Sequence, residues 1–420
     1  MASEMFVELD YTTGKKLGLE ITAGSLLAPL KITTENVAHR DLERSLSMAD
    51  NVDLYTLARE AGSIVFIVED HTRHSPVLET LEYLKFEFGR RAISWDKVKL
   101  LVATGTHRKM TEIELIEKFA SFLASTEIIQ HDAADGGEMK DFGNYMNVPL
   151  RINRNVESDL LVAIGSIVPH RFSGWSGGAK MVVPGVASYE TVFQSHRMAI
   201  LNSSADVGVV ENEFRDLIDE TGSRVGLDFI INYYYGKDGT VKGCVSGDHI
   251  TAHRRGVELA KGELLRVFDH RSDITVISSY PSTTDFWQGG KALYTADLIT
   301  KDGGDIIMVS PLNEGFGDHP AFAKLLRLKS AEILEELDGL TAQDPLAYVA
   351  AYAVKNIMER KRVHIVSDTA YRSMFDEIGL SVHDDLQKTI DSIKAKDREI
   401  VVLENSYILP QVETTMEVKL

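Results

Sequence analysis

The chain has 420 residues and carries 63 acidic against 45 basic side chains, a formal net charge of −18. This length is enough for two domains that each bury a core, and this charge opposes binding to nucleic acid and to anionic membranes. The single cysteine, Cys244, excludes an intrachain disulfide and a cysteine-based zinc or iron–sulfur site. Residues 1–18 lack a signal-peptide pattern and no apolar run reaches transmembrane length, so we expect a cytoplasmic protein that spans no membrane.

Strands that alternate with helices predict an α/β fold in the N-terminal part of the chain. Residues 5–32 alternate loosely around a turn at 12–14 and predict a hairpin or short strands. Strands are then expected at 64–68, 98–103, 127–130 and 160–164, and helices at 51–61, 77–88 and from Thr111. Glu114 completes a capping box with Thr111, and Ile113, Ile116 and Phe119 share one face of that helix. Strands joined by helices form mostly parallel sheets with right-handed crossovers.

A second α/β domain is expected in the C-terminal part of the chain. Segment 186–262 is predicted to be mainly helical, with one strand-like patch at 227–235 and a turn at 237–239. The polar stretch 267–273 marks a domain boundary, and new strands are expected at 274–278, 305–309, 362–367 and 400–403. The sequence therefore predicts an N-terminal domain over 1–268 and a C-terminal domain over 273–420, with the last ~15 residues packing back on the first domain.

Polar side chains gather where the strands of the first domain end. Arg73, His107, His131 and His170 each follow a predicted strand. In open α/β sheets, ligands bind outside the carboxyl ends of the strands. An arginine there can hold a carboxylate or phosphate, and an imidazole suits general acid–base chemistry near neutral pH. We therefore expect one shared site at this edge.

The loop that follows strand 160–164 concentrates the most unusual chemistry. Residues 167–185 contain four glycines, two prolines, His170 and Lys180, and His196 comes sixteen residues after Lys180. Glycines let backbone amides approach an anion closely, and a lysine whose cationic form is disfavoured has a nucleophilic amine. The spacing is not that of a Walker A sequence. We expect this loop to carry the chemistry.

Each motif taken alone also has an ordinary structural explanation. Arg73 can be ion-paired within its loop, His107 can cap the next helix, and a single histidine such as His196 is more often a residue of the helix surface. Residues 288–291, Gln-Gly-Gly-Lys, look like a helix start with a solvent-exposed lysine, and the pair at 131–132, His-Asp, is a weak catalytic candidate. It is the combination that favours function.

Taken together, these residues resemble the nickel-pincer-dependent lactate racemase family. The resemblance covers most of the chain and lies in motifs that agree in order and spacing: Asp70-His71-Thr72-Arg73, Gly105-Thr106-His107-Arg108, Pro169-His170, Ser176-Gly177-Gly178-Ala179-Lys180, His196, Gln288 and Lys291. It implies two α/β domains, each with a largely parallel sheet flanked by helices, and an active site in the interdomain cleft.

The resemblance also implies a cofactor, the nickel(II) pyridinium-3-thioamide-5-thiocarboxylate mononucleotide, which other proteins make and insert. Lys180 would bind it covalently, and His196 would be the protein's nickel ligand, a role that suits a borderline imidazole donor. Further contacts to the cofactor are implied for the first loop and the glycine-rich segment, namely Asp70, His71, Thr72, Arg73, Gly177, Gly178 and Pro184.

The implied activity is racemisation or epimerisation of a 2-hydroxy acid by proton-coupled hydride transfer. His107 and His170 match the two bases that take the hydroxyl proton of either enantiomer. Arg73, Gln288 and Lys291 would hold the substrate's carboxylate and polar groups. Arg171 lies outside the family pattern, as does the bulky Trp287. A cation at Arg171 would pair with a second carboxylate or a polyol hydroxyl and so favour a substrate larger than lactate.

Two other interpretations stay open at this point. A hydrolase or dehydratase would use a simple divalent metal bound by His107, His170 and His196, and a ligand-binding homologue that kept the fold would bind anions without turnover. A nucleotide bound covalently to Lys180 would distinguish the racemase from the first alternative. Racemisation of a single enantiomer would distinguish it from the second.

Overall fold

The chain forms two compact units in a computed structural model, which describes residues 4–22, 25–29, 31–32, 42–47, 49, 52–201, 205–317, 319–338, 344–393 and 398–413. Unit 1 comprises Met1–Thr34, Lys237–Gly239 and Gly262–Leu420, and unit 2 comprises Glu35–Gly236 and Thr240–Lys261. Within the described residues, no helix is both long and apolar enough to cross a membrane.

Unit 2 is built on a six-stranded sheet with the order β13-β12-β9-β4-β5-β6. All neighbouring strands are parallel except β12 and β13, which form an antiparallel hairpin. The chain starts at the centre with β4, winds outward to β6, and then returns to build the other half from β9, so the winding direction reverses between β4 and β9. The strands are β4 (Ile64–Glu69), β5 (Val98–Ala103), β6 (Glu127–Gln130), β9 (Leu160–Ile167), β12 (Phe229–Tyr235) and β13 (Val241–Gly247).

Helices cover the sheet of unit 2, and the apolar runs of its central strands explain why. Every residue of β4 and β9 is buried, as expected for parallel strands packed on both faces. Phe66 of β4 packs in one core cluster with Leu84 and Phe88, and its ring stacks on Trp95 at 6.0 Å. The described α-helices of this unit are α1 (Leu42–Ser47), α2 (Leu54–Glu60), α3 (Val77–Arg90), α4 (Glu112–Phe119), α5 (Tyr189–Leu201), α6 (Glu213–Val225) and α7 (Thr251–Leu264), of which α7 ends within unit 1.

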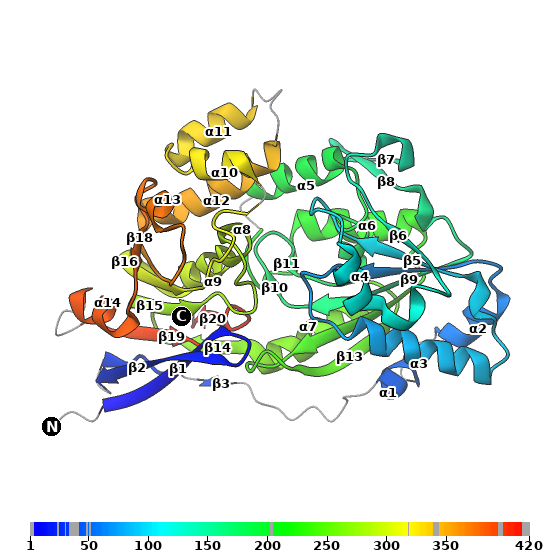
Figure 1. Cartoon of the computed structure of the whole chain (residues 1–420), viewed down its shortest axis with the longest axis horizontal. Helices are drawn as coiled ribbons and strands as arrows, with labels where there is room; N and C mark the ends of the chain where they lie inside the picture. The colour runs from blue at the N-terminus through cyan, green and yellow to red at the C-terminus, as the bar shows by residue number, and fades with distance from the viewer. Residues whose placement is uncertain are drawn as a thin grey trace, which may run out of the picture. The chain divides into compact units, whose positions relative to one another are not determined.

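Unit 1 contains a five-stranded, fully parallel sheet with the order β18-β17-β16-β15-β19. The N-terminal hairpin, β1 (Glu4–Thr12) and β2 (Lys15–Thr22), places Leu9 and Leu19 in one core cluster with Val276 of β15, and Figure 1 shows it in blue beside this sheet. The sheet strands are β15 (Ser272–Ser278), β16 (Thr300–Val309), β17 (Arg362–Val366), β18 (Ser381–His383) and β19 (Ile400–Leu403).

The remaining elements of unit 1 are a small sheet and seven described helices. The sheet has the order β20-β14-β3, from β3 (Lys31–Ile32), β14 (Leu265–Phe268) and β20 (Leu409–Val412). The helices are α8 (Phe286–Gly289), α9 (Lys291–Ile299), α10 (Pro320–Leu325), α11 (Ser330–Asp338), α12 (Pro345–Arg360), α13 (Arg372–Asp376) and α14 (Leu386–Ile393).

The sequence predicted most of these elements because their apolar periodicity is strong. Three strands have the predicted bounds, namely β5, β6 and β19, and the capping box of Thr111 and Glu114 is present. The prediction of a mainly helical segment at 186–262 was wrong for β13, which pairs with β12 across the predicted turn. The hairpin of β7 (Met139–Tyr145) and β8 (Val148–Asn153) was also missed, because β7 is mostly exposed and has no apolar alternation.

Other differences concern which surfaces are buried. The predicted face of α4 is not a core face, since Ile113 and Ile116 are 69% and 57% exposed and only Phe119 is buried. Residues 1–34 belong to the same unit as 262–420, whereas the sequence analysis assigned them to the first domain. Of the last ~15 residues, β20 pairs with β14 inside unit 1, and 414–420 lie outside the described residues.

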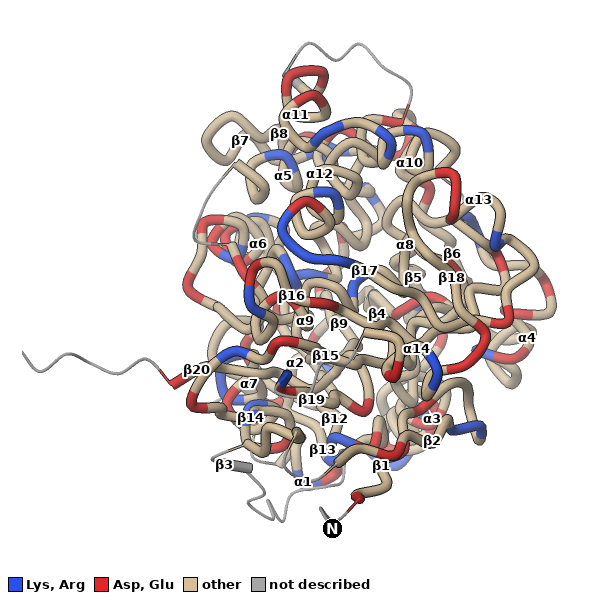
Figure 2. Tube along the Cα trace, turned by 90° about the vertical axis from the view of Figure 1, so that its left-hand side faces the viewer, with Lys and Arg blue, Asp and Glu red and all other residues tan. Residues whose placement is uncertain are grey.

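Acidic and basic residues are interspersed along the chain, as Figure 2 shows, and some are paired deep in the structure. The Asp305 side chain in β16 is 1% exposed and accepts hydrogen bonds from His364 at 2.9 Å, from Arg362 at 2.8 and 2.6 Å, and from Arg398. Burial raises the pKa of Asp305, but these hydrogen bonds and charges outweigh it and hold that pKa below its ordinary value.

Replacing Asp305 by Asn should therefore lower the free energy of unfolding at pH 7 by about 3 kcal/mol, because three cationic or titratable partners lose a buried carboxylate. The folded-state pKa lies below the unfolded value of about 4, so this contribution is complete above that pH and is lost as the pH falls through the folded-state pKa. Urea denaturation measures both effects. Asp384→Asn is the control, since Asp384 is 82% exposed; equal losses in the two variants would contradict the account.

Candidate active site

The predicted site residues of unit 2 lie on loops that leave the carboxyl ends of neighbouring strands. Asp70 follows β4, Gly105 and His107 follow β5, and His170 follows β9. Since β4 and β9 are adjacent and diverge in winding direction, a crevice is expected between the loops that follow them. This is the edge at which the sequence placed a shared site.

Asp70 and His107 form a direct pair at this edge. The Asp70 carboxylate is 2% exposed, and its Oδ2 lies 2.7 Å from His107 Nδ1. Its Oδ1 accepts from the Thr72 amide at 3.0 Å and from the Thr72 hydroxyl at 2.6 Å. Burial raises the pKa of Asp70, but the His107 hydrogen bond and the nearby charge of Arg73 outweigh it, so the pKa lies well below its ordinary value. Asp70 is therefore an anion at neutral pH.

The Asp70 anion fixes which nitrogen of His107 carries a proton. A carboxylate only accepts hydrogen bonds, so His107 Nδ1 donates and Nε2 of the neutral ring holds the lone pair. The same carboxylate orders the arginine loop, because Arg73 donates to the Thr72 hydroxyl at 3.0 Å. A base and a cation are thus tied to one buried acid.

Lys118 of α4 is a member of this cluster that the sequence analysis missed. Its ammonium donates to the Arg73 carbonyl at 2.9 Å, and burial lowers its pKa. Lys118 lies in the last turn of an amphipathic helix, where a lysine is common, so nothing in the sequence distinguished it from a surface lysine. It fixes the main chain of the loop that carries Asp70 and Arg73.

The segment that carries Lys180 is joined to the His107 loop through the main chain. The Gly105 amide donates to the Gly185 carbonyl at 2.9 Å, and the Gly185 amide donates to the Lys180 carbonyl at 3.2 Å. Pro184, a predicted cofactor contact, lies between these bonds, and its carbonyl oxygen is 3.7 Å from where a Cβ on Gly105 would lie. The loops that follow β5 and β9 are therefore held together.

Gly177 and Gly178 are explained by close packing within the protein. Both have positive φ angles, +84° and +62°, and both are buried. A Cβ on Gly177 would lie 2.7 Å from Asn232 Oδ1, and one on Gly178 would lie 3.1 Å from the His249 carbonyl oxygen. A side chain would clash at Gly177, and at Gly178 it would be crowded and would strain the positive φ. Their contact with a cofactor stays a prediction.

His170 and His196 both contact one aromatic ring, that of Phe172. The centroid of Phe172 is 6.0 Å from that of His170 and 5.4 Å from that of His196. His170 Nδ1 accepts from the amides of Phe172 and Ser173 at 3.2 and 3.3 Å, so the neutral ring carries its proton on Nε2. His196 Nδ1 donates to the Val192 carbonyl at 2.8 Å, which leaves the lone pair on Nε2.

Arg171 already has partners within unit 2. Its guanidinium donates to Asp206 Oδ1 at 2.9 Å and also to the Ala205 carbonyl. The extra cation that the sequence analysis identified beside His170 is therefore ion-paired. A second substrate carboxylate would have to compete with Asp206 for it.

Gln288 and Lys291 lie together in unit 1, at the start of α8 and α9. The Lys291 ammonium donates to Gln288 Oε1 at 2.6 Å. The backbone amide of Gln288 donates to the carboxylate of Asp285, the N-cap of α8, at 2.7 Å. The neighbouring Trp287 ring stacks on the His319 imidazole with centroids 3.7 Å apart. These residues follow β15, at the carboxyl edge of the unit 1 sheet.

His131 does not share the site, although it also follows a strand. It is completely buried, with Nε2 at 3.0 Å from the Ala187 carbonyl and Nδ1 at 3.1 Å from the Asn153 amide. Burial lowers its pKa to about 4, so it is a neutral structural residue. Asp132 pairs with Lys109 at 3.1 Å, and the proposed catalytic pair at 131–132 is not supported.

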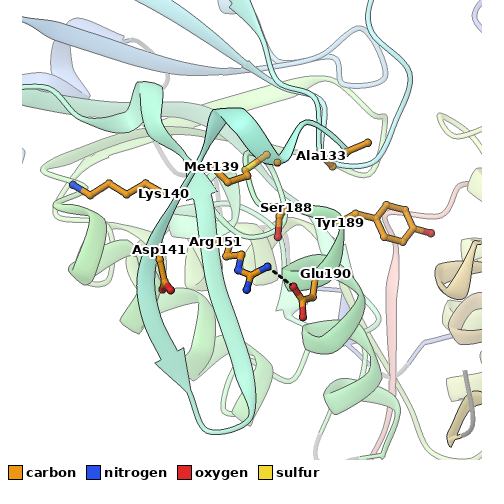
Figure 3. A pocket seen from close by; sticks show the side chains of 10 residues that line it. Ala133, Met139, Lys140, Asp141, Arg151, Ser188, Tyr189 and Glu190 are labelled. Carbon is orange, nitrogen blue, oxygen red and sulfur yellow. Dashed lines mark hydrogen bonds and ion pairs between the residues drawn. The ribbon is translucent and has the colours of Figure 1, made fainter. Parts of the chain in front are cut away.

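A pocket of about 370 Å³ lies between the β7–β8 hairpin and the start of α5, as Figure 3 shows. Arg151 and Glu190 form an ion pair at 2.8 Å on its wall. None of the predicted site residues lines it. The remaining lining residues are Ala133, Ala134, Gly136, Met139, Lys140, Asp141, Ser188 and Tyr189.

Within the described parts of the chain, no group of three or more His, Cys, Asp or Glu side chains is arranged to hold a metal ion. The divalent-metal alternative requires His107, His170 and His196 to come together as ligands. The structure does not group these three histidines as a metal site, and His107 is hydrogen-bonded to Asp70.

The chain is similar to known proteins over most of its length. Residues 15–208 match the lactate racemase N-terminal domain, and residues 267–408 match the lactate racemase C-terminal domain. The lactate racemase of Lactiplantibacillus plantarum is 30% identical over 388 residues, which cover 89% of either chain. The chain belongs to the lactate racemase family. The family's enzymes are isomerases, and this chain is accordingly assigned to the racemases.

Two further comparisons agree with this membership. The lactate racemase of Thermoanaerobacterium thermosaccharolyticum is 33% identical over 296 residues, 69% of this chain and 68% of the relative. The structure of the lactate racemase apoprotein from that organism has a TM-score of 0.86 at 26% identity and covers 98% of this chain and all of that one. A Thermotoga maritima protein, with a TM-score of 0.68 at 20% identity, shares the fold over 86% of this chain and 96% of its own.

The Asp70–His107 pair leads to a prediction about activity. A role of His107 as a base predicts that Asp70→Asn lowers kcat for lactate racemisation by on the order of 100-fold, because His107 loses the anion that fixes its tautomer. Circular dichroism of the lactate product measures the rate. Asp132→Asn, which removes an exposed carboxylate, should leave kcat within about twofold. Equal activity of Asp70→Asn and the wild type would show that His107 does not need this partner.

Proposed function

We propose that this protein racemises or epimerises a 2-hydroxy acid, with a nickel-pincer nucleotide bound covalently to Lys180. The observation that carries the proposal is the pairing of His107 with the buried Asp70 anion beside Arg73, at the edge where the winding of the sheet reverses. The pairing supports the proposal because removal of a hydroxyl proton from a 2-hydroxy acid requires a base, and binding of its carboxylate requires a cation.

The residues proposed to hold the cofactor have suitable chemistry. His196 donates from Nδ1 to a backbone carbonyl, the outer-shell bond that orients most metal-ligating histidines and directs Nε2 toward the metal. His71 Nδ1 is buried and has no hydrogen-bond partner among the described residues, as expected for a group that a bound molecule satisfies. Lys180 lies on a short 3₁₀ turn, Gly178–Met181, that the protein braces from several sides.

We propose that the cofactor, when bound, supplies an acceptor for the hydride on C2 of the substrate. His107 takes the hydroxyl proton at Nε2, and Asp70 stabilises the imidazolium that results. His170 is proposed as the base for the hydroxyl of the opposite enantiomer, and it takes that proton at Nε2 when the neutral ring is in the tautomer protonated on Nδ1. Arg73 binds the substrate carboxylate, a role proposed also for Gln288 and Lys291.

The role of Lys180 can be tested by mass. Protein produced together with the cofactor-making and inserting proteins should contain nickel and should be heavier than the sequence mass by one nucleotide, and peptide mapping should place the added mass on Lys180. Lys180→Arg should lose both the added mass and racemase activity, whereas Lys109→Arg, at an exposed salt bridge, should keep both. An active, nickel-loaded wild type without added mass would overturn the covalent attachment.

Arg171 is proposed to influence substrate choice, and its pairing with Asp206 gives this a sharp test. Arg171→Ala should lower kcat/KM for a 2-hydroxy dicarboxylate or a sugar acid by about tenfold or more relative to lactate, because one charge-assisted contact is lost. Asp206→Asn should act in the opposite direction by releasing the guanidinium. If neither variant changes kcat/KM for these substrates relative to kcat/KM for lactate, Arg171 only stabilises its loop.

A further inference from the structure

We propose that Arg215 and His253 are positioning residues for Lys180, and that they act by binding successive carbonyls of the loop that precedes it. The inference deepens the proposed function, because it concerns how the lysine that would carry the cofactor is held. Neither residue belongs to the motifs that the sequence analysis identified, and both come from helices remote from Lys180 in the sequence, α6 and α7.

Three consecutive main-chain carbonyls are held by these two side chains. The Arg215 guanidinium donates to the Trp175 carbonyl and, through Nη1 at 3.2 Å, to the Gly177 carbonyl. His253 Nε2 lies 2.8 Å from the Ser176 carbonyl between them. The carbonyl of an amide only accepts, so Nε2 of His253 carries a proton.

The bond to Gly177 connects this group directly to Lys180. The Gly177 carbonyl also accepts the Lys180 amide at 3.3 Å, the bond that closes the first turn of the 3₁₀ helix. The next amide, that of Gly178, donates to Asn232 Oδ1 of β12 at 2.7 Å. The main chain that leads into Lys180 is therefore fixed by α6, α7 and β12 at once.

The burial and charge of Arg215 indicate that the loop is the reason for an arginine at this position. Its side chain is 0% exposed, although a buried guanidinium is costly unless it is well paired. Its carboxylate neighbour, Asp219, lies 3.6 Å away and is shared with Arg254, whose Nη2 is 2.5 Å from Asp219 Oδ2. Arg215 Nε has no hydrogen-bond partner among the described residues. The loop carbonyls thus supply most of its hydrogen bonds.

His253 is suited to the same task because it stays neutral. Burial lowers its pKa well below the ordinary value. Its Nδ1 accepts from Arg254 at 2.8 Å, which leaves Nε2 as the donor toward Ser176. A fork of two donors from Arg215 and one donor from His253 matches three carbonyls in sequence, which a single lysine or an apolar side chain cannot do.

The test measures the Lys180 main chain and the reaction separately. In cofactor-free protein, Arg215→Met should speed hydrogen–deuterium exchange of the peptide that contains the Lys180 amide by about tenfold or more, because the turn loses its bracing. Arg215→Lys should restore part of the protection. Arg224→Met is the matched control on the same helix, since Arg224 pairs with Glu220 at the surface, and it should leave this exchange unchanged.

In the loaded enzyme, Arg215→Met should lower kcat by on the order of 100-fold, because the substitution displaces the lysine that carries the cofactor. KM for lactate should stay within about threefold, because Arg215 does not bind substrate. Arg215→Lys should recover part of the loss. Unchanged exchange at Lys180, or a loss confined to KM, would overturn the proposal.

Two further arms keep the outcome decisive. If Arg215→Met does not fold, His253→Leu takes its place and His253→Gln, which retains a donor, serves as the rescue variant. Wild-type protein that carries no added mass on Lys180 would contradict the proposed function, whereas the exchange of the Lys180 amide in cofactor-free protein would still decide whether Arg215 and His253 hold this turn.

Discussion

The adjacency of β4 and β9, from which the chain winds in opposite directions, is the constraint on which the site of unit 2 depends. In open α/β sheets, ligands bind outside the carboxyl ends of two such strands, where the loops leave in opposite directions. Asp70 and His170 stand at the ends of these two strands, and β5 brings His107 beside Asp70. The order of the strands thus brings together residues that are remote in the sequence.

Buried charged groups hold the loops at this edge within a chain of net charge −18. The Asp70 anion is satisfied by His107 and Thr72, and the Arg215 cation is satisfied mainly by loop carbonyls. A hydrogen bond or ion pair inside the protein is stronger than the same interaction in water. Groups that such interactions hold in place do not need to reorganise during a reaction. Asp70 orients the His107 ring, and Arg215 binds carbonyls of the loop that leads to Lys180.

The sequence predicted those features that depend on local pattern or on a motif. Alternating apolar strands and helices gave the two α/β units, and the order of motifs gave the family. The assignment of residues 1–34 failed because the partner of a hairpin such as β1–β2 is chosen by tertiary packing, here Leu9 and Leu19 on Val276. The helix face of Ile113 and Ile116 is not buried, because periodicity shows that residues share a face but does not show that another element covers it.

The same distinction applies to the site. His107, His170 and Lys180 follow strands or glycines and could be proposed from the sequence. Arg215, His253 and Lys118 lie within ordinary helical sequence, and their hydrogen bonds to backbone carbonyls required the fold. The glycines at 177 and 178 had a visible signal, but their cause, contact with Asn232 and His249, required the fold.

The central claim, hydride transfer from C2 of a 2-hydroxy acid, is tested most directly with L-lactate deuterated at C2. The loaded enzyme should convert it to D-lactate in ordinary water with the deuterium retained on C2, because a hydride carried within the site does not exchange with solvent. Replacement of that deuterium by solvent hydrogen at the rate of racemisation would instead show that a base removes C2–H as a proton, and it would contradict the account.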